Sequence, residues 1–542
     1  MIQEDRSSFS KWSPSIGLCL TLFTVAFNVS VIPAIMPRIV RDLDSSMGYV
    51  QAALVLLALV KASFAPTCEN LIKQFGRKPV FLSGLVLFGM GTIATSLSPS
   101  IGMFVISYSL ICGLGATPLI SSPRELIGII HSEKTEMYSQ LALIVASIIG
   151  GLTGAVLGGL IASNYGWRWS LMPQLLIIPL IAFLVRKVPR TVQAQTEPLD
   201  WVGGLLSFLG FGLTLLGVSL AGEYGWWFAK QEFKILDLVI PPFSLSIVPL
   251  LIATGIVCLG IFTAWQRQEA NQGKASLLRV GLLRYQPFLI CLFTASIHTL
   301  ITTGIQFNLY QFLPAVLNLN PFQTALAVLP FSLATLFAVV YATFKLVRRI
   351  NHKQIIYAGL TMFAVGIWQL YSAIDLQMKP LDILPALVVM GAGSGLFLAQ
   401  IGVTTFSTVR REELAEATGV YNPLQNLGSA LGRGILGSVL IVTASANIVD
   451  KVVIELGKTI SSAERSRAIQ VLEKVIQTYS TDERREFFSQ LPAAVQPSLN
   501  PIINSSVVEA MRTSVAIALI FSIICLILAF FVPKRFQTAR EV

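Results

Sequence analysis

Long apolar segments recur along the whole chain and are separated by short polar loops. Most are about 18 to 25 residues long, which is enough for an α-helix to cross the hydrocarbon core of a bilayer. Backbone polar groups must be paired inside lipid, and the short alternating segments of a transmembrane β-barrel are missing, so helices are predicted. The fourteen segments lie near residues 14-37, 49-70, 79-97, 101-130, 138-163, 170-186, 201-221, 239-264, 286-309, 322-344, 354-373, 383-406, 421-446 and 508-533.

Positive charge is distributed unevenly between the loops. An even number of membrane-spanning helices places both chain ends on one side, and most Lys and Arg of the short loops fall on that side. Cytoplasmic loops carry such an excess, so we expect a multi-pass protein of the cell (inner) membrane with both termini cytoplasmic. The main clusters are Lys73-Arg77-Lys78, Arg186-Lys187-Arg190 and Lys345-Arg348-Arg349-Lys353.

The chain contains an internal repeat. The stretch that begins at Cys68 recurs from Thr343, at an offset of about 275 residues, so that Lys78 aligns with Lys353. Gly76 aligns with Asn351, and because both residue types accept positive φ, the same tight turn is predicted at both. Phe27-Asn28 is likewise echoed by Phe307-Asn308. Parallel repeats of this kind build the two halves of transporters that work by alternating access.

The repeat divides the chain into two six-helix bundles and an inserted pair of helices. We expect an N-terminal bundle at 1-192, the inserted seventh and eighth helices at 193-275, and a C-terminal bundle at 276-542. The polar stretch at about 446-506 has amphipathic helical spacing and is predicted to fold as an outer helical hairpin.

Composition agrees with a lipid environment and excludes several functions. The 542 residues are 54% hydrophobic and only 12% charged, against about a quarter charged in soluble domains. The net charge of +11 does not indicate nucleic-acid binding, because the cations sit in short loops between apolar segments. The six cysteines show no metal-ligand spacing. No hydrolase, zinc-protease or nucleotide-binding motif occurs, so neither an enzyme nor a cofactor is predicted.

Several motifs, taken in order, resemble the fourteen-helix drug/proton antiporter branch of the major facilitator superfamily. The loop with Leu71, Gly76, Arg77 and Lys78 is similar to the signature between the second and third helices. Gly150, Gly154, Gly158 and Gly159 resemble the glycine motif of exporters in the fifth helix. Further matches are Tyr165 to Trp169, Leu199 to Gly203, the GAGSG run at Gly391, and Asn422 to Gly437. The resemblance implies two six-helix bundles with two inserted helices, and export of a small molecule.

Four positions depart from the family's pattern. Asn28 stands where the family has an acidic residue, Lys73 where the loop signature has Asp, Ser109 where the fourth helix has Arg, and Ala155 where the glycine motif has Pro. Transport is therefore implied more firmly than the family's usual coupling to protons.

Polar residues within the apolar segments are candidates for substrate binding. A charge near the bilayer centre costs about 2.5 to 3.5 kcal/mol, so it indicates a cavity or a partner. We expect a cavity of positive potential, suited to an anionic or zwitterionic amphiphile. The alternative is that each group is neutralised locally and serves packing. The candidates are Lys61, Arg124, Arg433, Asn28, Asn422, Asn426, Gln306 and Tyr310.

A proton-coupled carrier also needs a titratable group. Glu69, Glu125 and His298 are the candidates, and for His298 a packing role is the alternative. The leading hypothesis is a secondary transporter that exports an amphipathic organic compound, with an anionic compound as one candidate and protons as a candidate coupling ion; the charge of the substrate is left open. The alternative is a non-transporting membrane scaffold or assembly factor with a degenerate transporter fold. The oligomeric state is left open.

Overall fold

The chain folds almost entirely into long, apolar helices. A computed structural model describes residues 8–45, 47–130, 133–188, 200–225, 227, 234–235, 238–239, 245–272, 285–410, 413–478, 486–490, 492 and 495–533. Thirteen helices in this part of the chain are long and apolar enough to cross a membrane. The helix α2 (Met47–Phe75) adds a shorter apolar stretch, Ala52–Ala65. Each of the fourteen predicted positions therefore carries a helix, and the predicted polytopic all-α fold is confirmed.

The first six predicted segments form the N-terminal half. The fourth is interrupted by a π-helical turn, η1, and the sixth is preceded by a 3₁₀ turn, η2. The elements are α1 (Ser8–Asp42), α2, α3 (Arg77–Ser96), α4 (Ile101–Val105), η1 (Ile106–Ile111), α5 (Cys112–Ile130), α6 (Glu133–Tyr165), η2 (Trp167–Leu171) and α7 (Met172–Val185).

The inserted pair and the C-terminal half follow. The inserted helices are α8 (Trp201–Tyr224) and α9 (Ile247–Asn271), with a two-residue antiparallel strand pair, β1 (Lys234–Ile235) and β2 (Leu238–Val239), between them. The second half contains α10 (Gln286–Leu317), α11 (Pro321–Tyr341), the π-turn η4 (Ala342–Leu346), α12 (His352–Ala373), α13 (Leu384–Ser407), α14 (Leu414–Glu455), α15 (Ser462–Thr478), η6 (Gln496–Ser498) and α17 (Leu499–Phe530).

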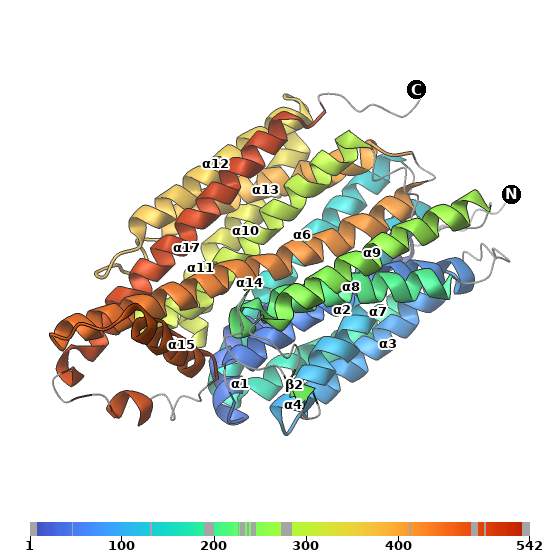
Figure 1. Cartoon of the computed structure of the whole chain (residues 1–542). Helices are drawn as coiled ribbons and strands as arrows, with labels where there is room; N and C mark the ends of the chain where they lie inside the picture. Colours follow the sequence, from blue (N-terminus) through green and yellow to red (C-terminus); the bar gives the residue numbers. More distant parts are fainter. Residues whose placement is uncertain are drawn as a thin grey trace, which may run out of the picture.

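Each half has its own apolar core, and the two meet along a seam. Figure 1 shows the blue and cyan helices of the first half beside the yellow-to-red helices of the second. Contacts between α2 and α14, and between α6 and α11, join the halves. The inserted α8 packs on both α2 and α14. Asp200, in the Leu199 to Gly203 motif, accepts hydrogen bonds from Gly203 N at 2.7 Å and Trp265 Nε1 at 3.0 Å, which ties the start of α8 to the end of α9.

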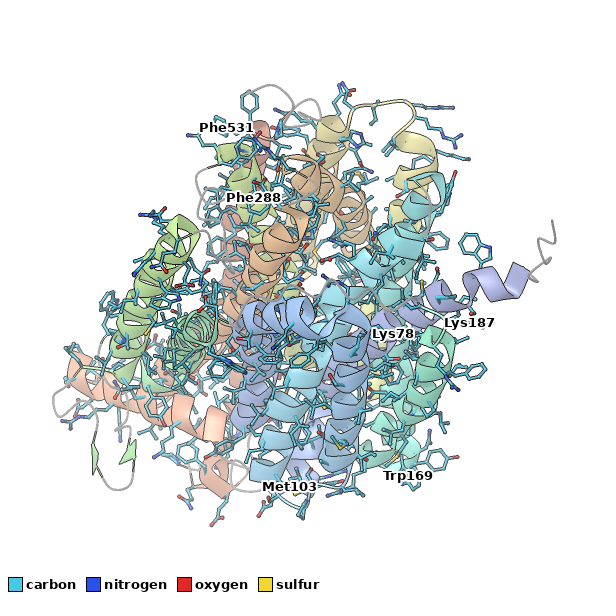
Figure 2. The ribbon with its side chains drawn as sticks, turned by 90° about the vertical axis from the view of Figure 1, so that its right-hand side faces the viewer. Lys78, Met103, Trp169, Lys187, Phe288 and Phe531 are labelled. Atoms are coloured by element: carbon cyan, nitrogen blue, oxygen red, sulfur yellow. The ribbon has the colours of Figure 1, made fainter. Side chains whose placement is uncertain are left out.

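Repeat-related residues make related contacts in the two halves. Lys78 donates to the carbonyls of Arg186 and Val188, just past α7, both at 2.7 Å, and the aligned Lys353 donates to the carbonyl of Phe530, at the end of α17. Both lysines thus place a cation at the C-terminal end of the last helix of their half, where the helix dipole is negative. Figure 2 shows Lys78 beside Lys187 at one end of the first half, with Met103 and Trp169 at the other.

The aligned asparagines extend this pattern. Asn28 on α1 donates to Gln174 Oε1 on α7 at 3.0 Å, and Asn308 on α10 donates to Ser514 Oγ on α17 at 2.8 Å. Both asparagines are about 1% exposed. In each half, the first helix is therefore bound to the last by a buried amide.

The predicted equivalence of the two turns is wrong in detail. Gly76 has φ +86° before α3, as expected, but Asn351 has φ −68°. Asn351 instead begins α12 in a capping box with Gln354, whose side-chain oxygen accepts from Asn351 N at 3.2 Å. Asparagine is a favoured N-cap residue, so here the capping hydrogen bonds replace the left-handed turn.

Helices occupy much of the polar stretch at about 446-506. The helices α14 and α17 extend into it at both ends, and the well-defined helix between them is α15. Ile448, Leu472, Val495 and Ile502 share a small apolar core, and Arg465 binds Asp450 through two hydrogen bonds of 2.7 Å. The apolar face of α15 therefore packs on the extended helices of the second half, and the outer hairpin as a whole stays a prediction.

Candidate functional site

A cavity of about 350 Å³ lies on the seam between the halves. Its walls come from α1, α2 and α6 of the first half and from α10, α11, α13 and α14 of the second. Much of the wall is apolar, including Val29, Pro33, Leu152, Val328 and Phe331. A partly apolar concave site between two domains is the usual setting for an organic ligand.

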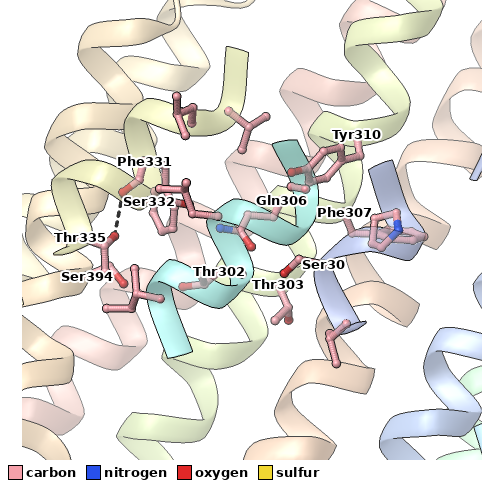
Figure 3. Close-up of a pocket in the computed structure, with 18 of the residues that line it drawn as sticks. Ser30, Thr302, Thr303, Gln306, Phe307, Tyr310, Phe331, Ser332, Thr335 and Ser394 are labelled. Atoms are coloured by element: carbon pink, nitrogen blue, oxygen red, sulfur yellow. Dashed lines mark hydrogen bonds between the residues drawn. The ribbon is translucent and has the colours of Figure 1, made fainter. Parts of the chain in front are cut away.

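Four of the predicted site residues line this cavity. They are Gln306, Tyr310 and His298 on α10, and Arg433 on α14. Figure 3 shows Gln306 and Tyr310 among the side chains that surround the cavity. The positions of Gln306 and Tyr310 at the cavity are compatible with contact to a ligand.

Arg433 is held in place across the seam. Its guanidinium donates to the carbonyl of Leu54 on α2 at 3.0 Å and to Ser429 Oγ on its own helix at 2.7 Å. The carbonyl of the preceding residue, Ala53, accepts a 2.8 Å hydrogen bond from Ser109. Among the described residues that line the cavity, Arg433 is the one that carries a fixed charge, and none is a carboxylate. Arg433 is therefore the source of fixed positive charge among the described residues of this cavity.

The other predicted substrate-binding residues are not among the lining residues. Asn28 joins α1 to α7, so its amide is used inside the first half. Lys61 is only 9% exposed and lies about two turns beyond Leu54 on α2. Arg124 lies over the ring of Phe406 at 5.2 Å, a cation–π contact. Although Asn422 and Asn426 share a helix with Arg433, that helix turns only Arg433 toward the cavity.

Two candidate coupling residues, Glu69 and Glu125, are ion-paired away from the cavity. Arg77 contacts Glu69 Oε2 at 3.4 Å and also pairs with Glu125. Arg77 is 8% exposed, so it crosslinks the ends of α2, α3 and α5 in a largely dry environment. Breaking a buried ion pair leaves an uncompensated charge. This arrangement gives Glu69 and Glu125 a role in holding the loop motif of Leu71, Gly76, Arg77 and Lys78.

His298, the third coupling candidate, is packed between aromatic rings. Its ring centroid lies 4.7 Å from that of Phe363 and 4.4 Å from that of Phe397. The ring is 2% exposed, and its Nε2 atom has no hydrogen-bond partner in the described part of the chain. His298 therefore offers the cavity a free ring nitrogen.

The glycine motif brings α6 onto α1. A Cβ atom at Gly150 or Gly154 would fall on the backbone of Phe23 or Phe27, and one at Gly158 would lie 3.0 Å from Val31 Cγ2. The neighbouring Gly159 is also buried. The predicted close helix packing is confirmed, because small residues let two helix backbones approach. The same stretch of α6 supplies Gly151 and Ala155 to the cavity wall.

Contacts between the halves close the seam at the end that carries the basic loops. Tyr138 on α6 stacks on Phe344 in η4, with ring centroids 5.8 Å apart. Leu141, Ala338 and Ala342 share a small apolar cluster there. The Arg124–Phe406 contact joins α5 to α13 in the same way. A ligand in the cavity could leave by this route only if these contacts separate.

Several hydroxyl-bearing residues of the cavity were not predicted from the sequence. Threonine and serine are common in apolar helices, where they bond to their own backbone, so they carry little signal alone. A helical-wheel comparison with His298 and Gln306 on α10 would have brought Thr302 into view. The hydroxyl-bearing residues concerned are Ser30, Thr299, Thr302, Thr303, Ser332, Thr335 and Ser394.

Comparison with known proteins agrees with this architecture. The sequence model of the Major Facilitator Superfamily matches residues 18–432. The chain is 26% identical over 436 residues to "Multidrug resistance protein Stp" of Mycobacterium tuberculosis H37Rv, covering 80% of this chain and 76% of that protein. It is 23% identical over 518 residues to "Multidrug transporter protein MdtP" of Bacillus subtilis 168, covering 93% and 90%.

Solved structures share the fold. A bacterial homolog of the human lysosomal transporter Spinster, inward-facing and unoccupied, superposes with a TM-score of 0.58 at 13% identity, over 97% of this chain and 98% of that one. A partially occluded inward-open conformation of the xylose transporter XylE from E. coli gives 0.53 at 13% identity, over 90% and 98%. The two halves, the seam cavity and the matched sequence lead to one conclusion: this chain is a multi-pass membrane transporter that belongs to the major facilitator superfamily.

Proposed function

We propose that the protein exports an amphipathic, anionic organic compound by alternating access, with the seam cavity as the substrate site. The observation that carries this proposal is the cavity's composition, an apolar wall shared by both halves with Arg433 as its fixed charge. An anion there gains attraction that is stronger than in water, because the surrounding protein lowers the effective dielectric constant. The names of the multidrug-transporting relatives support export of such compounds.

Sidedness follows from the loops and belongs to the same proposal. Lys78 and Lys353 lie at corresponding ends of the two halves. The positive-inside rule supports our proposal that this end faces the cytoplasm, that both termini lie there, and that the protein resides in the cell (inner) membrane. The contacts Tyr138–Phe344 and Arg124–Phe406 then form the cytoplasmic closure.

We assign proton coupling to His298. The ionisable residues that line the cavity are His298, Tyr310 and Arg433. Of these three side chains, the imidazole is the one whose ring nitrogens can both accept and donate a proton without a permanent charge. Glu69 and Glu125 are occupied by Arg77 outside the cavity. Among the three candidates, His298 is the one placed to exchange a proton for substrate.

Flux across proteoliposomes tests the proposal. The probes are 8-anilinonaphthalene-1-sulfonate, a fluorescent anionic amphiphile, and the cation ethidium. We expect an imposed pH gradient to drive movement of the sulfonate, and His298→Gln to abolish the dependence of this movement on the gradient. Preferential transport of ethidium would overturn the charge assignment. Absence of flux for both probes, in folded protein, would favour the alternative of a non-transporting scaffold.

A further inference from the structure

Two sets of polar groups around the cavity differ in how their hydrogen-bonding capacity is used. In the first set, each hydroxyl is already bonded to its own helix. Thr299 donates to the carbonyl of Ala295 at 3.0 Å, Thr303 to that of Thr299 at 2.7 Å, and Thr335 to that of Phe331 at 2.8 Å. This is ordinary behaviour for threonine in an apolar helix. These groups need nothing from a ligand.

The second set consists of three buried atoms without a partner: His298 Nε2, Thr302 Oγ1 and Ser394 Oγ. In the described part of the chain, none of them makes a hydrogen bond. Thr302 is an exception on its own helix, because Thr294, Thr299 and Thr303 all donate to the carbonyl four residues earlier. A buried polar group without a partner costs about 1–3 kcal/mol. Three such groups on one cavity are therefore a cost that a bound ligand would offset.

These three atoms lie on the same wall. His298 and Thr302 are one turn apart on α10, so they share a face of the helix. Ser394 comes from α13, which packs against α10. All three residues line the cavity. Figure 3 shows Thr302 and Ser394 among the side chains that surround it. Because Phe363 and Phe397 hold the His298 ring from both sides, the wall is organised before a ligand arrives.

The chemistry of these groups defines what they can bind. A hydroxyl both donates and accepts, and neutral imidazole carries one donor and one acceptor nitrogen. No carboxylate is present among the described lining residues to attract a cation, and the guanidinium that suits an anion belongs to Arg433 on another helix. An uncharged oxygen, in a hydroxyl or carbonyl group, matches three neutral donor–acceptor groups.

We propose that His298, Thr302 and Ser394 form a hydrogen-bonding subsite for an uncharged oxygen of the substrate. This rests on the proposed function, since it takes the seam cavity as the substrate site. The substrate is then an amphiphile with a hydroxyl or carbonyl group in addition to its apolar body, and that oxygen is bound separately from any charged group near Arg433.

Matched probe pairs test the subsite. The first pair is 6-hydroxynaphthalene-2-sulfonate and 6-methylnaphthalene-2-sulfonate, and the second is 2-naphthol and 2-methylnaphthalene. Within each pair, a hydroxyl replaces a methyl group of nearly the same size. Dissociation constants are measured with the purified full-length protein in detergent. We expect the hydroxyl compound to bind roughly tenfold more tightly in both pairs, the equivalent of about 1.4 kcal/mol.

Variants locate the preference. Thr302→Val and Ser394→Ala should each reduce the tenfold preference to about threefold or less, and the double variant should remove it. Thr303→Val is the matched control, because Thr303 lines the same cavity but its hydroxyl is already bonded. Thr303→Val should keep the preference, and Thr302→Ser should restore it. Size-exclusion chromatography and thermal unfolding confirm that each variant is folded.

The two probe pairs separate this inference from the proposed function. Weak binding of both sulfonates, with the naphthol preference intact, would contradict the anionic substrate and leave the subsite supported. An unchanged preference in the folded Thr302→Val/Ser394→Ala double variant would overturn the subsite. So would equal binding within both pairs by the unmodified protein.

Discussion

Replacing Arg433 by glutamine tests how the cavity selects charge. The guanidinium is fixed by Leu54 O at 3.0 Å and Ser429 Oγ at 2.7 Å, so it presents a stationary positive charge to the cavity. For an anion about 6 Å away at an effective dielectric constant of about 20, the attraction is about 2.8 kcal/mol. Each 1.4 kcal/mol corresponds to about a factor of ten in affinity. Arg433→Gln should therefore weaken binding of 6-hydroxynaphthalene-2-sulfonate by about 100-fold.

The neutral compound 2-naphthol provides the internal comparison. Because it has no charge, its affinity should change by less than about threefold in the same variant. Arg433→Lys keeps the charge and loses the forked geometry, so it should retain most of the affinity for the sulfonate. Binding is measured by isothermal titration calorimetry. Equal losses for the sulfonate and for 2-naphthol would show that Arg433 acts through structure, and unchanged sulfonate binding would refute the electrostatic reasoning.

Three further predictions concern stability. Lys78→Met and Lys353→Met should each lower the free energy of unfolding by about 0.5–1 kcal/mol in thermal unfolding, because both lysines bind carbonyls at helix C-termini. A loss of stability in one variant alone would argue against the equivalence of the two lysines. Gly154→Ala should destabilise the folded protein by about 1–3 kcal/mol, because the added Cβ would fall on the backbone of Phe27. Gly260 faces open space, so Gly260→Ala should leave the melting temperature unchanged. Equal melting temperatures for the two variants would contradict the packing argument. Hydrogen bonds from Ser461 lower the pKa of Glu464 below 4.5, so their contribution to α15 is present above pH 4.5 and lost as the pH falls through the folded-state pKa. The hydrogen-exchange protection of α15, corrected for the intrinsic pH dependence of exchange, should therefore fall at low pH, and Glu464→Gln should flatten that dependence.

The apolar pattern was sufficient to predict the fold, because helix length and bilayer thickness leave few alternatives. The internal repeat could also be predicted from the sequence. Lys78 and Lys353 show why, because both lysines donate hydrogen bonds to backbone carbonyls at the end of a helix. The Gly76–Asn351 turn was predicted incorrectly, since asparagine serves equally well as an N-cap. Propensity alone does not decide between these two uses.

The site was predictable only in part. Arg433 was found because a charge in an apolar helix is conspicuous, but its partner Leu54 is 379 positions away and comes from the other half. Asn28 is also a polar residue in an apolar helix, so the sequence marks it in the same way. Its packing role becomes visible only through its hydrogen bond to Gln174. Thr302 was missed for the opposite reason. A threonine in an apolar helix is common. What distinguishes Thr302 is that its Oγ1 atom makes no hydrogen bond in the described part of the chain.

The central claim is that the halves separate and rejoin along the seam during transport. Cysteines at Tyr138 and Phe344, whose rings stack between α6 and η4, allow this contact to be locked in a background without the six native cysteines. A pair at Asp450 and Arg465, both in the second half, is the control. Flux of 8-anilinonaphthalene-1-sulfonate in proteoliposomes should stop when the seam pair is oxidised, resume on reduction, and be unaffected by the control pair. Undiminished flux through the fully cross-linked seam pair would contradict alternating access.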